Sequence, residues 1–139
     1  MGRVFFDTRK NVVDIAAAYQ VLPSDSGTTF IINQASAYTI TLPLMADIER
    51  GWNCQFIIGT VAANKVIIIN TDGEDTIVGN IGTSEIADSA TASLLATTAV
   101  DEIAFISGAQ LGETVNLVSN GVNYFVTGST SAADHITIT

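Results

Sequence analysis

Isoleucine, valine and threonine together supply 46 of the 139 residues, and they occur in short runs along the chain. These β-branched side chains are stiff at χ1 and suit strands better than helices. Glycine, asparagine, aspartate and serine separate the runs at intervals of about ten residues, a spacing typical of a β-sandwich or small barrel. The sequence therefore predicts an all-β fold, a small antiparallel β-barrel or sandwich. The expected strands are residues 28–33, 38–42, 54–60, 66–70, 76–78, 99–107, 114–119, 122–127 and 135–139.

The clearest hairpin is predicted at Asn120 and Gly121, between the strands expected at 114–119 and 122–127. Both turn residues tolerate the positive φ that a type I′ turn requires. A second turn is predicted at Asp72 and Gly73, after the strand expected at 66–70.

Two segments do not follow the strand pattern. Residues 12–19, VVDIAAAY, predict a short helix of about two turns, which is too short to be stable in water unless it docks on the rest of the protein. Residues 81–98 are rich in serine, threonine and alanine, and they predict a long loop or a weak pair of strands.

Charge is distributed unevenly along the chain, whose formal net charge is -9. Residues 1–20 hold three basic and two acidic side chains, whereas residues 21–139 hold two basic and twelve acidic ones. Adjacent exposed phenylalanines such as Phe5 and Phe6 are costly unless they bury against something. We therefore expect an N-terminal extended docking arm with a short helix over 1–20 and a β domain over 21–139. The alternative for this segment is a fraying terminus.

Composition excludes several classes of protein. An apolar content of 47% with only 14% charged residues does not fit a disordered chain. A net negative chain without a basic stripe does not fit direct binding to nucleic acid. No membrane contact is expected, because the longest aliphatic run, residues 66–69, is far shorter than the roughly 20 residues that span a bilayer. Five charged side chains within residues 1–20 do not fit a secretory signal, so we expect synthesis in a host cytoplasm.

The single cysteine and the single histidine are expected to be structural. Cys54 has no partner for a disulfide and no neighbouring base, which favours a small buried hydrophobic residue. His135 begins an alternating His-Ile-Thr-Ile-Thr run and would share a strand face with Thr137 and Thr139, as a solvated histidine. One histidine and one cysteine cannot build a zinc site from these residue types.

No catalytic motif is found in the sequence. A Gly-x-Ser-x-Gly elbow, a phosphate-binding loop and a dinucleotide fingerprint are all missing. The adjacent acid pairs Glu74-Asp75 and Asp101-Glu102 would point to opposite faces of a strand, which does not suit a pair of catalytic carboxylates. The sequence predicts neither an enzyme nor a cofactor.

Two binding sites are possible but not favoured. Residues 70–75 place oxygen ligands around a glycine turn, as Ca²⁺ prefers, yet Ile81 stands where an EF-hand loop needs glutamate. A plain turn is favoured, and ion binding by Asp72 and Asp75 stays open. Trp52, near Tyr38 and Phe56 in the expected strands, could stack on a sugar, but a lone tryptophan in a small β domain is more often a core residue.

A series of short motifs follows along the chain in the order SGTTF (26–30), YTITLP (38–43), GWNCQFII (51–58), VIIIN (66–70), DTIVG (75–79), GETVNLV (112–118) and YFVTG (124–128). This order, over roughly residues 20–139, resembles the small β-structured virion proteins of tailed bacteriophages, namely capsid decoration (cement) proteins and tail-fibre domains. Tyr124 stands where a tryptophan is expected in the last hairpin. The resemblance implies a homotrimer on the capsid exterior that clamps neighbouring major capsid subunits without a cofactor.

The residues expected to contact the shell follow from the charge division and the phenylalanine pair, and the resemblance does not supply them. Charged and aromatic side chains of the arm would make the contact, with aliphatic side chains packing behind them. The capsid-binding residues so predicted are Arg3, Phe5, Phe6, Arg9 and Lys10, with Val12, Val13 and Ile15 behind.

Two other functions remain in competition. A tail-fibre or tailspike module that binds a host glycan would also be a trimer, with a solvent-facing aromatic patch around Trp52 or Tyr124. A free-standing carbohydrate-binding module of a cellular enzyme is less favoured, because the sequence shows no linker, partner domain or export signal.

Overall fold

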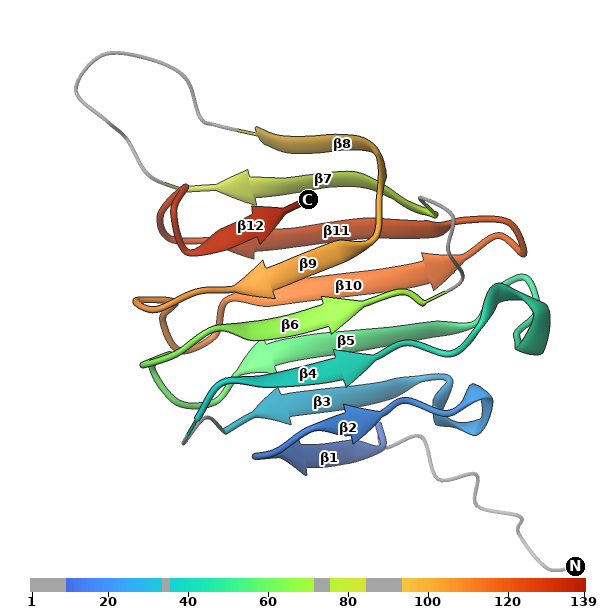
Figure 1. The fold of residues 1–139 in the computed structure, drawn as a ribbon, viewed down its shortest axis with the longest axis horizontal. Helices are drawn as coiled ribbons and strands as arrows, with labels where there is room; N and C mark the ends of the chain where they lie inside the picture. Colours follow the sequence, from blue (N-terminus) through green and yellow to red (C-terminus); the bar gives the residue numbers. More distant parts are fainter. Residues whose placement is uncertain (1–9, 34–35, 72–75, 85–93) are drawn as a thin grey trace, which may run out of the picture.

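A computed structural model describes residues 10–33, 36–71, 76–84 and 94–139 of the chain, and within them the fold is built from two β-sheets (Figure 1). The seven-stranded sheet has the order β1-β3-β5-β10-β11-β7-β8, and the five-stranded sheet has the order β12-β9-β6-β4-β2. The all-β prediction is confirmed. The first sheet comprises β1 (Val12–Ile15), β3 (Thr28–Ile32), β5 (Asn53–Ile58), β7 (Ile77–Thr83), β8 (Leu94–Val100), β10 (Thr114–Ser119) and β11 (Tyr124–Thr130). The second comprises β2 (Tyr19–Gln20), β4 (Tyr38–Thr41), β6 (Val66–Ile69), β9 (Glu102–Phe105) and β12 (Ile136–Ile138).

The first six strands alternate between the two sheets, which makes their neighbours parallel. β1, β3 and β5 are parallel to one another in one sheet, and β2, β4 and β6 are parallel in the other. Each strand is therefore followed by one in the opposite sheet, and the chain returns beside its earlier strand in the same direction. The expectation of an antiparallel arrangement holds for the pairings that β9, β10 and β12 make, and it is wrong for the pairings among the first six strands and for β7 with β11.

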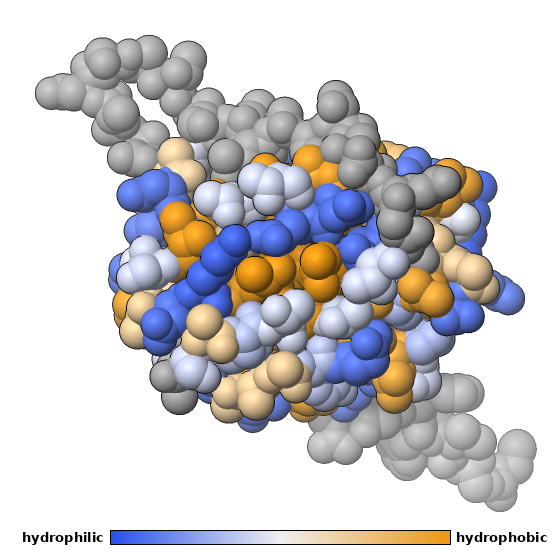
Figure 2. Space-filling model, viewed as in Figure 1, coloured by the Kyte–Doolittle hydropathy of each residue, from blue (hydrophilic) through white to orange (hydrophobic). Residues whose placement is uncertain are grey.

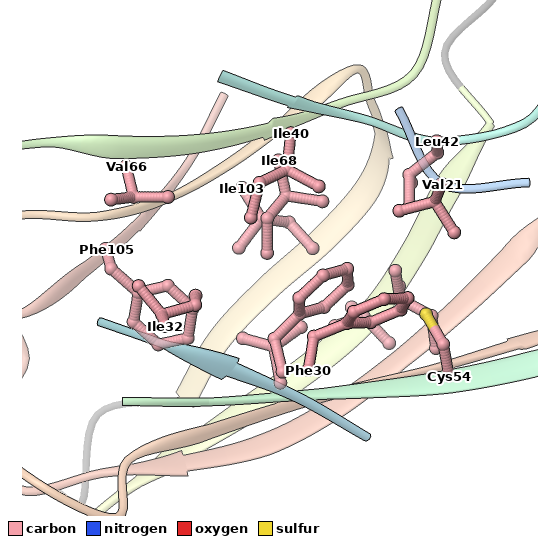
Figure 3. Packing of buried hydrophobic residues seen from close by; sticks show 14 of the residues in the cluster. Val21, Phe30, Ile32, Ile40, Leu42, Cys54, Val66, Ile68, Ile103 and Phe105 are labelled. Carbon is pink, nitrogen blue, oxygen red and sulfur yellow. The ribbon is translucent and has the colours of Figure 1, made fainter. Parts of the chain in front are cut away.

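The core lies between the two sheets. Phe30 and Phe56 stack with ring centroids 5.2 Å apart on the inner face of the seven-stranded sheet. Ile40 and Ile68 project toward them from β4 and β6, as Figure 3 shows for the Phe30 side of the cluster. These four side chains are fully buried. Alternation along each strand gives both sheets one apolar face, and the two faces cover each other.

The predicted hairpin is present as β10 and β11, which pair from Thr114–Ser129 to Ser119–Tyr124. The predicted two-residue type I′ turn is wrong, because Ser119 pairs with Tyr124 and the loop therefore comprises the four residues 120–123, with Gly121 at φ of 89°. The Asn120 side-chain oxygen accepts hydrogen bonds from the backbone N–H groups of Val122 and Asn123. The hairpin inserts between β5 and β7, and β11 pairs with β7 in parallel.

The helix predicted over residues 12–19 is wrong, because this segment contributes an edge strand to each sheet. β1 pairs with β3, and β2 pairs with β4. Pairing supplies the hydrogen bonds that a two-turn helix would have to form alone, and β-branched Val12, Val13 and Ile15 suit the pleat. Residues 12–20 therefore belong to the β body, and the proposed division at residue 21 does not separate them from it.

Two other expectations change at the strand level. Of the two alternatives for 81–98, the described residues fit the pair of strands, because the end of β7 at Thr83 pairs antiparallel with the start of β8 at Leu94, while 85–93 lie outside the described residues. The strand predicted over 99–107 is divided between β8 and β9, in different sheets. The 3₁₀ turns at Pro23–Asp25 and Met45–Asp47 are short, and none of the helices in the described ranges has the length and apolarity to cross a bilayer.

Candidate functional site

The predicted shell-contact residues divide into two groups. Arg3, Phe5, Phe6 and Arg9 lie outside the described residues. Lys10 is the first described residue and is exposed immediately before β1. The arm would therefore leave the body at the edge of the seven-stranded sheet.

The aliphatic residues expected to pack behind the arm lie on β1. Val12 is exposed, Val13 is half-buried, and Ile15 belongs to the core. Alternation on a strand explains the difference between neighbouring positions, because successive side chains point to opposite faces. Ile15 thus holds β1 on the body, while shell contact by Val12 and Val13 stays a prediction.

A shallow groove of about 200 Å³ runs from Lys10 across the outer face of the seven-stranded sheet to Val118. Its floor is polar and uncharged, because the strand register aligns Thr29, Gln55 and Asn116 on β3, β5 and β10. The Thr29 hydroxyl donates a hydrogen bond to Gln55 Oε1 at 3.4 Å. The groove thus connects the first described residue to the middle of the sheet.

An apolar patch lies at the far end of this groove. Val118 and Phe125 face each other across β10 and β11, and they are 48% and 47% exposed. Val78 of β7 is the register partner of Phe125 and is half-buried. We call Val78, Val118 and Phe125 the Phe125 patch. The sequence analysis missed it, although the alternation along 114–119 already leaves Val118 on the face opposite the core.

Charged residues are rare on the strands of both sheets, where Asp14 of β1 and Glu102 of β9 are the charged residues within the described strands. The strands β3, β5, β10 and β11 contain no charged residue, although the chain has a net charge of -9. On the five-stranded sheet, Lys65 and Glu102 form an ion pair at 2.6 Å. Figure 2 looks onto the five-stranded sheet, which lies in front in the same view of Figure 1, and it shows hydrophobic residues at the centre of that face with hydrophilic ones around them. The area over β3, β5, β10 and β11, which lacks charged strand residues in an acidic protein, is suited to burial against another surface, since depletion of charge is typical of interface centres.

A buried carboxylate joins two loops at the opposite end of the molecule from the hairpin turn. Glu113 is 4% exposed, and its Oε1 atom accepts hydrogen bonds from the Ser131 backbone N–H at 2.9 Å and from the Ser131 hydroxyl. The same oxygen lies 2.7 Å from His135 Nδ1. The expectation of a solvated His135 is therefore wrong, because the side chain is only 16% exposed and is held by Glu113.

Glu113, Ser131 and His135 form what we call the Glu113 cluster, and its geometry is that of a contact that stabilises the fold. Burial by itself raises the pKa of Glu113, but the hydrogen bonds from Ser131 and His135 outweigh burial and leave the pKa below its usual value. The Ser131 hydroxyl and the carboxylate both contact Nδ1 of His135, at 3.2 Å for the hydroxyl. In a serine-hydrolase triad the two would contact different ring nitrogens. The cluster instead ties the β9–β10 connection to the β11–β12 connection.

Trp52 and Tyr124, the aromatic residues that a glycan-binding patch would use, are buried. Trp52 is 5% exposed, and its indole N–H donates to the Pro23 carbonyl at 3.0 Å. Its ring meets Tyr124 edge to face, with centroids 5.8 Å apart, and the Tyr124 hydroxyl donates to the Pro43 carbonyl. The prediction that Trp52 is a core residue is confirmed. Trp52 and Tyr124 do not form the solvent-facing aromatic patch expected of a fibre module.

Cys54 is buried, as predicted, beneath the outer groove. Desolvation and the negative charge of Asp25 raise the pKa of the Cys54 thiol well above its usual range. A protonated, buried thiol is a poor nucleophile, so Cys54 acts as a packing residue.

The candidate calcium turn is only partly within the described residues, since Asp72 and Asp75 fall outside them. Asn70 before the turn is buried, and its side chain donates a hydrogen bond to the hydroxyl of Thr76 after it. Among the described residues, no group of three or more histidine, cysteine or acidic side chains is placed to hold a metal ion.

Comparison with known proteins gives this chain no family: no family model matches it, and no curated protein matches its sequence.

Proposed function

We propose that this chain is a structural virion protein that decorates a phage capsid and stabilises it by bridging neighbouring major capsid subunits as a homotrimer. In this proposal the two sheets form a β-sandwich body, and the residues before β1 form the docking arm. The role is mechanical, since added contacts between subunits resist the internal pressure of packaged DNA. It places the protein on the capsid exterior.

The observation that carries the proposal is a run of four adjacent strands without a charged residue in the seven-stranded sheet, beside the edge strand β1 with its exposed Asp14. Association brings acidic bodies together, and their mutual repulsion has to be offset by the burial of surface that has no charged groups to desolvate. Four adjacent strands without a charge, β3, β5, β10 and β11, offer such a surface. The motif order that resembles decoration proteins supports the same conclusion.

The competing tail-fibre function loses its main structural requirement. It needs an aromatic platform in solvent, yet Trp52 and Tyr124 are both buried and hydrogen-bonded to backbone carbonyls. Nothing else in the described residues favours glycan binding over capsid binding, so one function is proposed.

The test is binding to phage heads that lack this protein, measured by co-sedimentation. Full-length protein should bind, and a variant that lacks residues 1–9 should bind much more weakly. Removing residues 1–20 would be a poor test, because it also deletes β1 and β2 and exposes the core at Ile15. Unchanged binding after removal of residues 1–9 would contradict the docking arm, and no binding by the intact protein would contradict the capsid function.

A matched pair of charge variants separates a specific arm contact from a general effect of charge. Arg9→Ala and Arg50→Ala change the net charge equally, but Arg9 belongs to the arm and Arg50 is an exposed body residue near the β10–β11 turn. Arg9→Ala should weaken head binding, whereas Arg50→Ala should leave it unchanged. Equal weakening by both would mean that only the overall charge of the protein matters.

A further inference from the structure

Asn120 differs from every other asparagine of the chain in the residue that follows it. Gly121 follows Asn120, whereas each of the other asparagines precedes a residue with a side chain. The backbone nitrogen of the following residue is the group that attacks the side-chain amide carbon of an asparagine to close a five-membered succinimide ring. A side chain on that residue obstructs the approach, and glycine removes the obstruction.

The attacking nitrogen lies in an exposed loop and outside the ladder of strand hydrogen bonds. The last pair of the β10–β11 ladder is Ser119 with Tyr124, and both Asn120 and Gly121 are exposed beyond it. The Gly121 N–H donates a hydrogen bond to the Ser119 hydroxyl at 2.9 Å. Because a hydroxyl rotates freely about its C–O bond, this nitrogen becomes available without opening the hairpin.

The side-chain amide of Asn120 is polarised by the loop. Its Oδ1 atom accepts hydrogen bonds from the backbone N–H groups of Val122 at 2.9 Å and Asn123 at 2.7 Å. Two backbone donors on one carbonyl oxygen withdraw electron density from Cγ and stabilise the negative charge that forms on the oxygen during attack, as an oxyanion hole does.

The same hydrogen bonds hold the two reacting atoms in one small ring. The ring that the bond from Val122 N–H to Asn120 Oδ1 closes contains both Cγ of Asn120 and the backbone nitrogen of Gly121. Restraining two reacting groups in this way replaces part of the entropy that a flexible chain would lose on reaching the transition state.

We propose that Asn120 is a site of spontaneous covalent modification in the folded protein. The Gly121 nitrogen bonds to Cγ of Asn120, and Nδ2 leaves as ammonia, taking up the proton that the Gly121 nitrogen loses. Water then adds to one of the two ring carbonyls and breaks its bond to the ring nitrogen, which gives aspartate or isoaspartate. Water is the only co-reactant.

The two products change the hairpin differently. Each replaces a neutral amide with a carboxylate and so adds one negative charge to a chain whose net charge is -9. Aspartate keeps the main chain as it is, and its carboxylate still accepts the N–H groups of Val122 and Asn123. Isoaspartate adds a methylene to the main chain of the four-residue loop. This chemistry concerns the loop alone and does not rest on the proposed capsid function.

The test follows the folded full-length protein over time at mildly alkaline pH by peptide mass mapping. Conversion is seen as the mass gained when NH₂ is replaced by OH, and electron-transfer fragmentation separates isoaspartate from aspartate. Conversion at Asn120 should be faster than at the other described asparagines by about tenfold or more. It should also be at least as fast in the folded protein as in the same chain unfolded in urea.

A matched pair of variants tests the role of the attacking residue. Gly121→Asn adds a side chain there while tolerating the positive φ of 89°, and it should slow conversion at Asn120 by about tenfold. Gly112→Asn is the control, because Gly112 has a similar φ of 86° and open space around its Cβ position but lies before β10, away from the hairpin loop. It should leave conversion at Asn120 unchanged.

Two outcomes would overturn the proposal. Slower conversion in the folded protein than in urea would mean that the loop holds the amide away from the Gly121 nitrogen and protects Asn120. Equal conversion in Gly121→Asn and the wild type would mean that the amide is lost by a route other than attack by that nitrogen. Neither result depends on capsid binding, which the head co-sedimentation measures separately.

Discussion

Glu113 holds together the loops at one end of the molecule, the end opposite the β10–β11 turn. One of its carboxylate oxygens accepts all three hydrogen bonds from Ser131 and His135, and these residues precede β12. A buried carboxylate is stable only when its hydrogen bonds are made, so the three contacts act as a unit. They anchor the last strand of the five-stranded sheet to the start of β10.

The first prediction concerns acid stability. Because the pKa of Glu113 is lowered from 4.5 in the folded protein, its stabilising contribution is complete above pH 4.5 and is lost as the pH falls through the folded value. Glu113→Gln should lower the free energy of unfolding at pH 7 by about 1–3 kcal/mol. It should also make the decline of that free energy below pH 4.5 shallower than in the wild type. Urea unfolding followed by Trp52 fluorescence at several pH values measures both effects.

The control for this prediction is Glu49→Gln, which removes a carboxylate from an exposed loop. Its unfolding curves should follow those of the wild type at every pH. If Glu113→Gln also ran parallel to the wild type under acid conditions, the lowered pKa of Glu113 would not contribute to stability.

At the scale of elements, the close approach of β7 and β11 depends on Gly79. The residue has φ of 140°, which L side chains rarely adopt, and a Cβ there would lie against the carbonyl oxygen of Val126. The parallel β7–β11 pairing and the shift of register toward β8 both occur at this position. Only glycine fits such a backbone.

The second prediction is that Gly79→Ala lowers the free energy of unfolding by about 3 kcal/mol, combining backbone strain with overpacking. Gly82→Ala lies on the same strand and is the matched control, because the nearest atom to its Cβ is 3.8 Å away and its φ is ordinary. Thermal unfolding monitored by circular dichroism should show a clear loss of Tm for the first variant and little change for the second. Equal losses would mean that β7 tolerates no side chain at either position, for a reason other than the Val126 contact.

Sequence patterns predicted the strands that alternate over several residues, and they failed where pairing partners decide the structure. The 114–119 strand was predicted with its correct ends, because its inward residues alternate with outward ones. Residues 12–19 were predicted as a helix because the alanines at 16–18 favour one. They form strands instead, because β1 pairs with β3 and β2 pairs with β4. His135 was expected in solvent because Glu113 is 22 residues away, and no local pattern reveals a long-range hydrogen bond.

At the scale of the whole molecule, charge is distributed unevenly both along the chain and over the surface of the two-sheet body. The body is acidic while residues 1–9 are not, and the outer face of β3, β5, β10 and β11 carries no charge. Self-association through that face would place acidic surfaces closer together without placing charges in the contact itself. The salt dependence of association therefore reports which surface is used.

The third prediction is a trimer in solution with a mass of three times 14.6 kDa, or about 44 kDa, measured by size-exclusion chromatography with light scattering at two protein concentrations. If the uncharged sheet face makes the contact, added salt screens the repulsion between acidic bodies, and the trimer should persist or strengthen. If exchanged arms held the copies together through attraction to acidic bodies, salt should dissociate them instead. A mass of 14.6 kDa at both concentrations and in high salt would contradict a preformed trimer. The shell would then have to supply the three-fold arrangement, and the sheet face would be free to contact the major capsid protein directly.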